Sequence, residues 1–155
     1  NLNGVFAYAA GPENQLAHWT RTGILEGAPA PKKAPRTAVW DNPAEPLEAR
    51  ARAYLDGNCA HYHNARGMAS NSGLFLDLEE TNPSLIGVGK RPVAAGRGSG
   101  GLEFAIAPGQ PDASILVHRM ASTEPGVMMP ELGRSLVHEE GLALVRDYIA
   151  KMQRR

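Results

Sequence analysis

Apolar residues recur at helical spacing in four segments of the chain, and this pattern predicts four helices. The first covers residues 13–22, and the second begins at Pro46, which suits a first helical turn. A third helix is expected from Pro111, and the fourth follows Ser135 near the C-terminal end. The pattern therefore favours a fold built mainly from helices.

The last of these predicted helices carries the strongest signal. Its apolar stripe consists of Leu142, Val145, Tyr148, Ile149 and Met152. We expect Ser135 to cap it, because a serine side chain can accept hydrogen bonds from the first free backbone N–H groups of a helix. Gly141 carries no side chain, so another helix can cross this one closely there.

The segments between the predicted helices are rich in turn-forming residues, since the chain holds 17 glycines and 12 prolines. A proline-rich stretch at residues 27–46 is typical of an extended connector. Apolar residues alternate at 74–78 and at 102–106, which predicts a short β-hairpin. We therefore expect an N-terminal helical extension at residues 1–45 and a mostly α domain with long ordered loops at residues 46–155.

Composition and charge argue against several classes of function. The formal net charge is zero, so nothing suggests a nucleic-acid partner. No apolar run approaches the roughly 20 residues that a membrane-spanning helix needs. The chain begins at Asn1 without a basic and apolar leader, so we expect a processed form or a fragment. No nucleophile elbow, dinucleotide fingerprint or P-loop is present, and we expect no enzyme activity.

The most informative motif runs from Cys59 to His63 and reads Cys-Ala-His-Tyr-His. It is one residue away from C-x-x-C-H, the signature in which two thiols bond a haem and the histidine ligates its iron. Cys59 and His63 have the required spacing, but Tyr62 stands where the second cysteine belongs. The motif thus offers one thiol and one imidazole to a haem.

A candidate for the second iron ligand lies before the last predicted helix, in the sequence Met128-Met129-Pro130. Proline disfavours helix at the residue before it, which keeps Met129 in a loop that can face a flat ligand. A thioether opposite an imidazole raises the reduction potential of a haem and favours electron transfer. We prefer Met129 to Met128 as the partner of His63.

Five stretches together resemble the class I, c-type cytochrome domain, and in particular the C-terminal region of a group of bacterial dihaem cytochromes. They are residues 14–19, 51–61, 72–77, 108–120 and 124–134. The resemblance implies a class I cytochrome c fold that carries covalent haem c, with His63 as the proximal and Met129 as the distal iron ligand. It also implies one-electron transfer in the bacterial periplasm, with a redox protein or a larger membrane-associated complex as partner.

Tyr62 departs from that family, in which this residue is normally cysteine. In one interpretation a haem is held by a single thioether from Cys59. In a second, position 62 is a misassigned cysteine and the domain is an ordinary c-type cytochrome. In a third, the protein has kept the scaffold without haem and serves as a structural or interaction subunit of a larger assembly.

Two further groups of residues are candidates for binding. Three arginines are expected either to pair with haem propionates or to be solvated surface residues: Arg91 and Arg97 in the glycine-rich stretch, and Arg119 on the third predicted helix. Cys59, His61 and His63 together suggest a copper or zinc site as an alternative to haem. No second cluster supplies the remaining ligands at metal spacing, which argues against that alternative.

Overall fold

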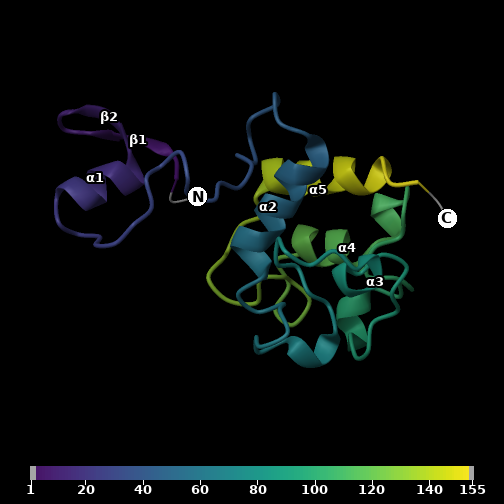
Figure 1. Cartoon of the computed structure of the whole chain (residues 1–155). Coiled ribbons are helices and arrows are strands. Elements are labelled where there is room, and N and C mark those ends of the chain that lie inside the picture. Colours follow the sequence, from purple (N-terminus) through teal and green to yellow (C-terminus); the bar gives the residue numbers. More distant parts are fainter. Residues whose placement is uncertain (1–2, 154–155) are drawn as a thin grey trace. The chain divides into compact units, whose positions relative to one another are not determined.

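The computed structural model describes residues 3–153, which fall into two compact units, Asn1–Val39 and Trp40–Arg155. In the first unit a β-hairpin precedes a helix (Figure 1). Strand β1 (Val5–Tyr8) pairs antiparallel with strand β2 (Gly11–Asn14). Gly11 has a φ of 115°, a backbone conformation that favours glycine, and this allows the tight turn between the strands.

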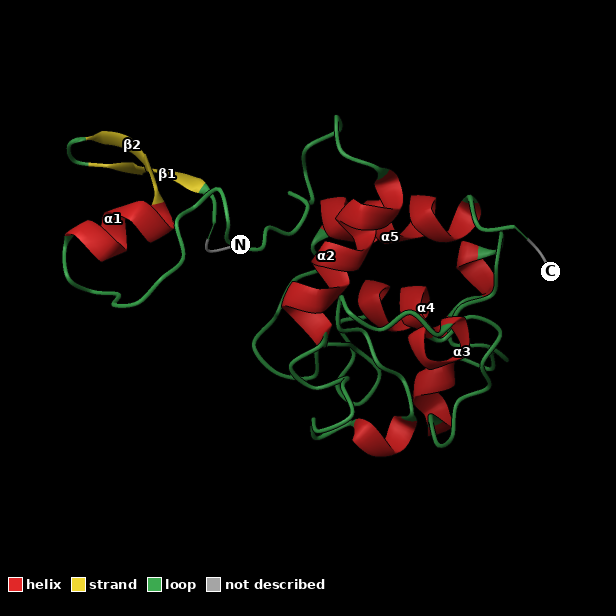
Figure 2. Cartoon of the chain, in the orientation of Figure 1, coloured by secondary structure: helices red, strands yellow, loops and turns green. Residues whose placement is uncertain are grey.

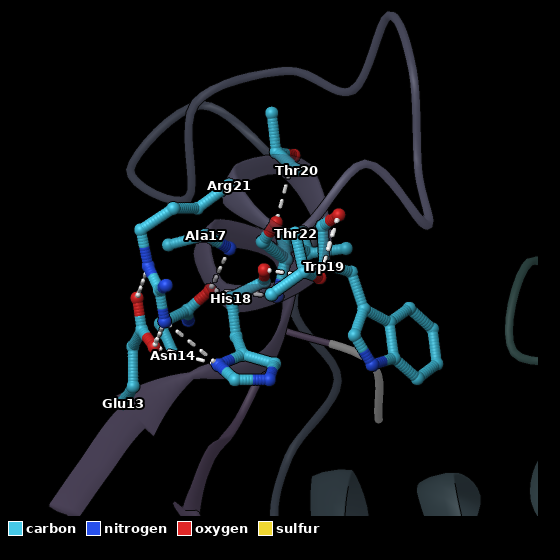
Figure 3. A network of polar contacts seen from close by, with 9 residues as sticks. Glu13, Asn14, Ala17, His18, Trp19, Thr20, Arg21 and Thr22 are labelled. Atoms are coloured by element: carbon cyan, nitrogen blue, oxygen red, sulfur yellow. Dashed lines mark hydrogen bonds and ion pairs between the residues drawn. The ribbon is translucent and has the colours of Figure 1, made fainter. Parts of the chain in front are cut away.

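Helix α1 (Gln15–Arg21) follows β2 directly and confirms the helix predicted at residues 13–22. The side chain of Asn14 caps it by accepting hydrogen bonds from the first backbone N–H groups of the helix. A polar network crosses from β2 to α1, in which Glu13 accepts hydrogen bonds from Arg21 and contacts the His18 ring at 2.7 Å (Figure 3). The Arg21 and His18 hydrogen bonds lower the pKa of Glu13 to about 2.

The second unit contains the other four α-helices of the described chain. They are α2 (Leu47–Cys59), α3 (Pro83–Ile86), α4 (Ile115–Ala121) and α5 (Glu139–Ala150). Helix α2 confirms the helix predicted from Pro46. The third predicted helix is also present, but its first turn is a separate 3-10 helix at Pro111–Ala113, because Ser114 is in an extended conformation.

Helices α2 and α5 cross in close contact at Gly141, as the sequence predicted. A Cβ atom built on Gly141 would lie 2.2 Å from the ring of Tyr54 on α2, so only glycine allows this approach. Leu55 from α2 and Val145 and Ile149 from α5 are fully buried in the core. The predicted cap at Ser135 is wrong, since α5 begins at Glu139 with His138 in the capping position.

The prediction of a mostly α fold of the class I cytochrome c type is wrong. The structure has five helices and a two-stranded antiparallel sheet, and most of the described residues lie in loops and turns (Figure 2). It is therefore a loop-rich mixed fold that is only weakly helical. The physical reason is partly the density of glycine and proline between residues 64 and 137, which confines α3 to four residues between Asn82 and Gly87. Helix α4 is limited to seven residues by the extended conformations of Ser114 and Ser122.

The predicted hairpin between residues 74–78 and 102–106 is also wrong, because the one hairpin among residues 3–153 lies at β1 and β2. The two apolar segments bond elsewhere. Leu76 donates its backbone N–H to the carbonyl of His63, and Ile106 forms an isolated parallel bridge with Val88. Of the alternating apolar residues, Leu76 and Ile106 are buried and Leu78 is exposed. The hydrogen-bond partners of each segment come from other parts of the chain.

Candidate functional site

A cavity of about 440 Å³ lies at the C-terminal end of α2, in the second unit. This volume falls within the roughly 300–1,000 Å³ range that is common for cofactor and ligand sites. One side is formed by the end of α2 and the turn after it, and another by α4 and the loop that joins α4 to α5. Cys59, Tyr62, His63, Arg119 and Met129 all line it. Five of the six binding residues predicted from sequence therefore meet at one site.

The helical turn after α2 brings Cys59 and His63 to the same side. The backbone N–H of His63 donates to the carbonyl of Cys59 at 2.9 Å, so the two residues are one helical turn apart. This is the spacing that a haem-attachment motif requires between its thiol and its iron ligand. The carbonyl of His63 in turn accepts the N–H of Leu76, which ties this turn to the core.

The imidazole of His63 is half-buried and its Nδ1 atom makes no hydrogen bond of good geometry within residues 3–153. Burial lowers the pKa of His63, because the charged ring loses hydration, while the nearby backbone of Leu74 opposes that effect. The ring is therefore neutral at neutral pH. Neutral imidazole is the form that ligates a metal, and an orphaned Nδ1 is a group that a bound partner or a small backbone shift would satisfy.

Cys59 lies half-buried at the cavity and packs against the hydrophobic core. Burial raises the pKa of its thiol to about 11. Cys59 is accordingly a protonated thiol at neutral pH, with little thiolate for spontaneous reactions. Its chemistry depends on a reaction partner that is held close to it.

Tyr62 contributes to the same wall, between the other two residues of the motif. Its carbonyl accepts the N–H of Ala69 at 3.1 Å, which closes a tight loop over residues 62–69. Gly67 approaches that carbonyl so closely that a Cβ atom on it would lie 2.2 Å from the oxygen. The phenol ring has an edge contact with His61, with the ring centres 4.9 Å apart.

On the other side, the structure distinguishes the two neighbouring methionines. Met129 lines the cavity, whereas Met128 is not among the lining residues. The backbone N–H of Met129 donates to the carbonyl of Arg119 at 3.0 Å, which fixes this loop to the end of α4. Of the pair, Met129 is the residue able to offer its sulfur to a bound group.

The three candidate arginines have different surroundings. Arg119 lines the cavity, where its Nε donates to the carbonyl of Val127 at 2.8 Å and its guanidinium lies 3.8 Å from Glu131. Burial lowers its pKa, and Glu131 opposes that shift. The guanidinium packs on Gly98, where a Cβ atom would lie 3.2 Å from Cζ, and this explains one glycine of the glycine-rich region.

Arg97 and Arg91 are outside the cavity lining. Arg97 is exposed and bonds Glu124 at 2.8 Å and the carbonyl of Pro125 at 2.6 Å. Arg91 pairs with Glu103 and lies over the ring of Phe104. Both side chains are engaged on the surface, so Arg119 is the one predicted arginine of the three that faces the cavity.

The copper or zinc alternative gains no support. Residues 3–153 contain no group of three or more His, Cys, Asp or Glu side chains that could hold a metal ion. His61 does line the cavity, but its ring lies against Tyr62.

Several lining residues escaped the sequence analysis. Buried or partly buried side chains from separate segments form the apolar walls, namely Leu74, Leu76, Leu116 and Met120. Exposed apolar side chains from three loops form the rim: Met68 (84% exposed), Val93 (70%) and Leu132 (74%). Met120 adds a second thioether to the cavity. Its helical spacing to Leu116 could have identified Met120. The lining residues in loops carry no periodic signal, so the sequence could not have identified them in this way.

Comparison with protein-family models, with curated proteins and with solved structures gave no match for this chain. Among residues 3–153, no helix is both long enough and apolar enough to cross a membrane.

Proposed function

We propose that the second unit binds one haem through a single thioether from Cys59, with His63 and Met129 as axial ligands, and that it transfers single electrons in the bacterial periplasm. One observation carries this proposal. A single apolar cavity brings together the thiol, the imidazole and the thioether that the sequence motifs singled out, although Met129 is 66 residues beyond His63 in the chain. The fold does not carry it, since the architecture is not the expected one.

The surroundings of these residues are compatible with a large flat apolar ligand. The walls are mostly apolar, and His63 is neutral, as an iron ligand must be. When bound, a haem supplies a metal that cycles between two oxidation states. Cys59 would hold it by adding its S–H across one vinyl group, so that a C–S bond forms and the thiol hydrogen ends on the other vinyl carbon. Atoms and electrons balance, and no oxidant is needed.

The remaining residues orient the group and adjust its potential. Met129 would hold the iron together with His63, and its soft thioether would favour the reduced state. Arg119 would pair with a carboxylate at the cavity, since a half-buried cation is stabilised by an opposite charge. Tyr62 lines the cavity but offers no thiol, so Cys59 alone would bond covalently to the group. The partner would be a redox protein or a larger membrane-associated complex.

A second candidate is a haem-free structural or interaction subunit of a larger assembly. Two observations favour it: Tyr62 takes part in the cavity wall, and the thiol of Cys59 is protonated at neutral pH. A phenol at this position would then fill space that a porphyrin edge would otherwise need. This candidate predicts an apolar cavity without covalent chemistry at Cys59.

A visible spectrum and an intact mass distinguish the two candidates. The chain would be produced in a periplasm that contains haem-attachment machinery, beside Cys59→Ser and Tyr62→Cys variants. The proposal expects a Soret band and one haem in the mass of the wild-type chain, and loss of the covalent haem in Cys59→Ser. In Tyr62→Cys a second thioether would move the α-band in alkaline pyridine to shorter wavelength. A wild-type chain without any Soret band would sink the proposal and favour the haem-free subunit.

A further inference from the structure

The C-terminal end of α4 is closed by a side chain from the loop that follows it. The last carbonyls of a helix lack partners within the helix, and Ser122 leaves α4 in an extended conformation. Arg134 supplies the missing donors. Its Nη1 donates to the carbonyl of Met120 at 3.0 Å, and its Nη2 donates to the carbonyls of Arg119, at 3.2 Å, and Ser122. A cation at this end also opposes the partial negative charge of the helix terminus.

Met129 shares one of these acceptors. The carbonyl of Arg119 accepts both the backbone N–H of Met129 and the Nη2 of Arg134. The side chain of Arg119 adds a third link, through its hydrogen bond to the carbonyl of Val127. The loop is thus fastened to α4 at residues 127, 129 and 134, and the cavity-lining methionine lies between the outer two links.

The residues beside Arg134 add little packing, and the loop is next anchored at Val137, which packs against the core, and at His138, whose Nδ1 lies 2.9 Å from the Tyr54 hydroxyl. Leu132 and Leu136, on either side of Arg134, have 74% and 78% of their surface exposed, so they contribute little packing. The Nε of Arg134 is buried without a hydrogen-bond partner in the described chain, which carries a cost. Its guanidinium nevertheless lies against the end of α4, where its fork reaches several carbonyls at once. A lysine would offer a single point charge instead.

We infer that Arg134 is a positioning residue that holds Met129 at the cavity by fastening the loop to the end of α4. This inference rests on the proposed role of Met129 as an iron ligand. Without the fork, the loop detaches more often and the sulfur of Met129 leaves the cavity for part of the time. A residue whose role was only to stabilise the fold would change the whole unit equally, whereas Arg134 acts on the loop and on the ligand that it carries.

The test compares Arg134→Gln and Arg134→Lys with Arg146→Gln, a control in which an exposed arginine loses its ion pair with Asp112. The first readout needs no haem: residue-specific hydrogen exchange of the Met129 amide, with the Leu142 amide of α5 as reference. We expect exchange at Met129 to be about tenfold faster in Arg134→Gln, which corresponds to the loss of about 1.4 kcal/mol of local stability. Exchange at Leu142 should be unchanged in every variant, and exchange at Met129 should be unchanged in the Arg146→Gln control. In Arg134→Lys, the exchange rate at Met129 should lie between those of the wild type and Arg134→Gln.

The second readout uses the haem-loaded protein. Arg134→Gln should lower the reduction potential and weaken the absorption band that marks iron–thioether bonding, in the direction of Met129→Ala. Unchanged exchange at Met129 in Arg134→Gln, or an equal increase at Leu142, would overturn the inference. If the wild type binds no haem while the exchange result holds, the positioning role stands and the proposed function fails. If the wild type has a methionine-ligated haem and Arg134→Gln leaves its reduction potential unchanged, the proposed function stands and the positioning role of Arg134 fails.

Discussion

The two sides of the cavity are built in different ways. Cys59, Tyr62 and His63 extend directly from α2, which crosses α5 at Gly141 and is anchored in the core. Met129 lies in a loop that polar groups tie to the end of α4. The helical side depends on packing, whose loss unfolds the unit, and the loop side depends on a few hydrogen bonds, whose loss frees one segment. We therefore expect the two sides to respond differently to mutation and pH.

The largest effect should come from breaking the support of the helical side. Gly141→Ala places a methyl group where the ring of Tyr54 already lies, so this buried ring must shift within the contact between α2 and α5. We expect a loss of about 3 kcal/mol in the free energy of unfolding, as for other overpacked cores. Gly57→Ala in α2 is the matched control, because nothing lies within 4 Å of its Cβ and alanine favours helix by about 0.5–1 kcal/mol. Urea unfolding measures the free energy of unfolding of both variants. Equal changes in Gly141→Ala and Gly57→Ala would contradict a close contact between α2 and α5 at Gly141.

The thiol of Cys59 should make stability depend on alkaline pH. Its pKa is 9.0 ordinarily and about 11 in the folded chain, so between these values the unfolded state loses the proton and the folded state keeps it. The folded state therefore loses stability as pH rises from 9 to 11, by about 1–2 kcal/mol after allowance for partial exposure. Cys59→Ser should remove this part of the dependence. Thiol alkylation of the haem-free chain should be slow at pH 8 and accelerate up to about pH 11.

His63 should produce a smaller dependence on the acid side, because the backbone of Leu74 partly offsets the effect of burial. The pKa of the folded ring is below its ordinary value of 6.5, so the unfolded state takes up the proton first as pH falls. Stability is thus present above pH 6.5 and is lost as pH falls towards the folded pKa. Between pH 7 and pH 5 the free energy of unfolding should fall more in the wild type than in His63→Gln. Parallel curves would argue against a buried neutral ring.

The smallest effect is expected on the loop side. Gly98→Ala brings a methyl group to 3.2 Å from the Arg119 guanidinium, which must shift by a few tenths of an ångström. We expect less than about 1 kcal/mol of global destabilisation, because the contact is with the far end of a flexible side chain, which can shift by that amount at low cost. The Nε–H signal of Arg119, bonded to the carbonyl of Val127, should report the shift by nuclear magnetic resonance. A global loss as large as that of Gly141→Ala would show that the two sides do not differ.

Prediction from sequence succeeded where the signal was local. The helix that ends at Cys59 and the close crossing at Gly141 followed from helical spacing and from the absence of a side chain. Prediction failed for two other features. Leu76 bonds His63, which is distant in sequence, rather than a neighbouring strand. The local hairpin of β1 and β2 was missed because the sequence Gly-Pro-Glu-Asn gives β2 no alternation of apolar residues.

By itself, the sequence determined that a thiol and an imidazole leave the end of α2 on one side, because four residues make about one helical turn. It also determined that a methionine precedes a proline outside any helix. Only the tertiary structure decided that Met129 rather than Met128 reaches the cavity, and that Arg119 rather than Arg97 faces it. Loops obey no period, so their side chains are oriented by distant contacts, here the carbonyls at the end of α4.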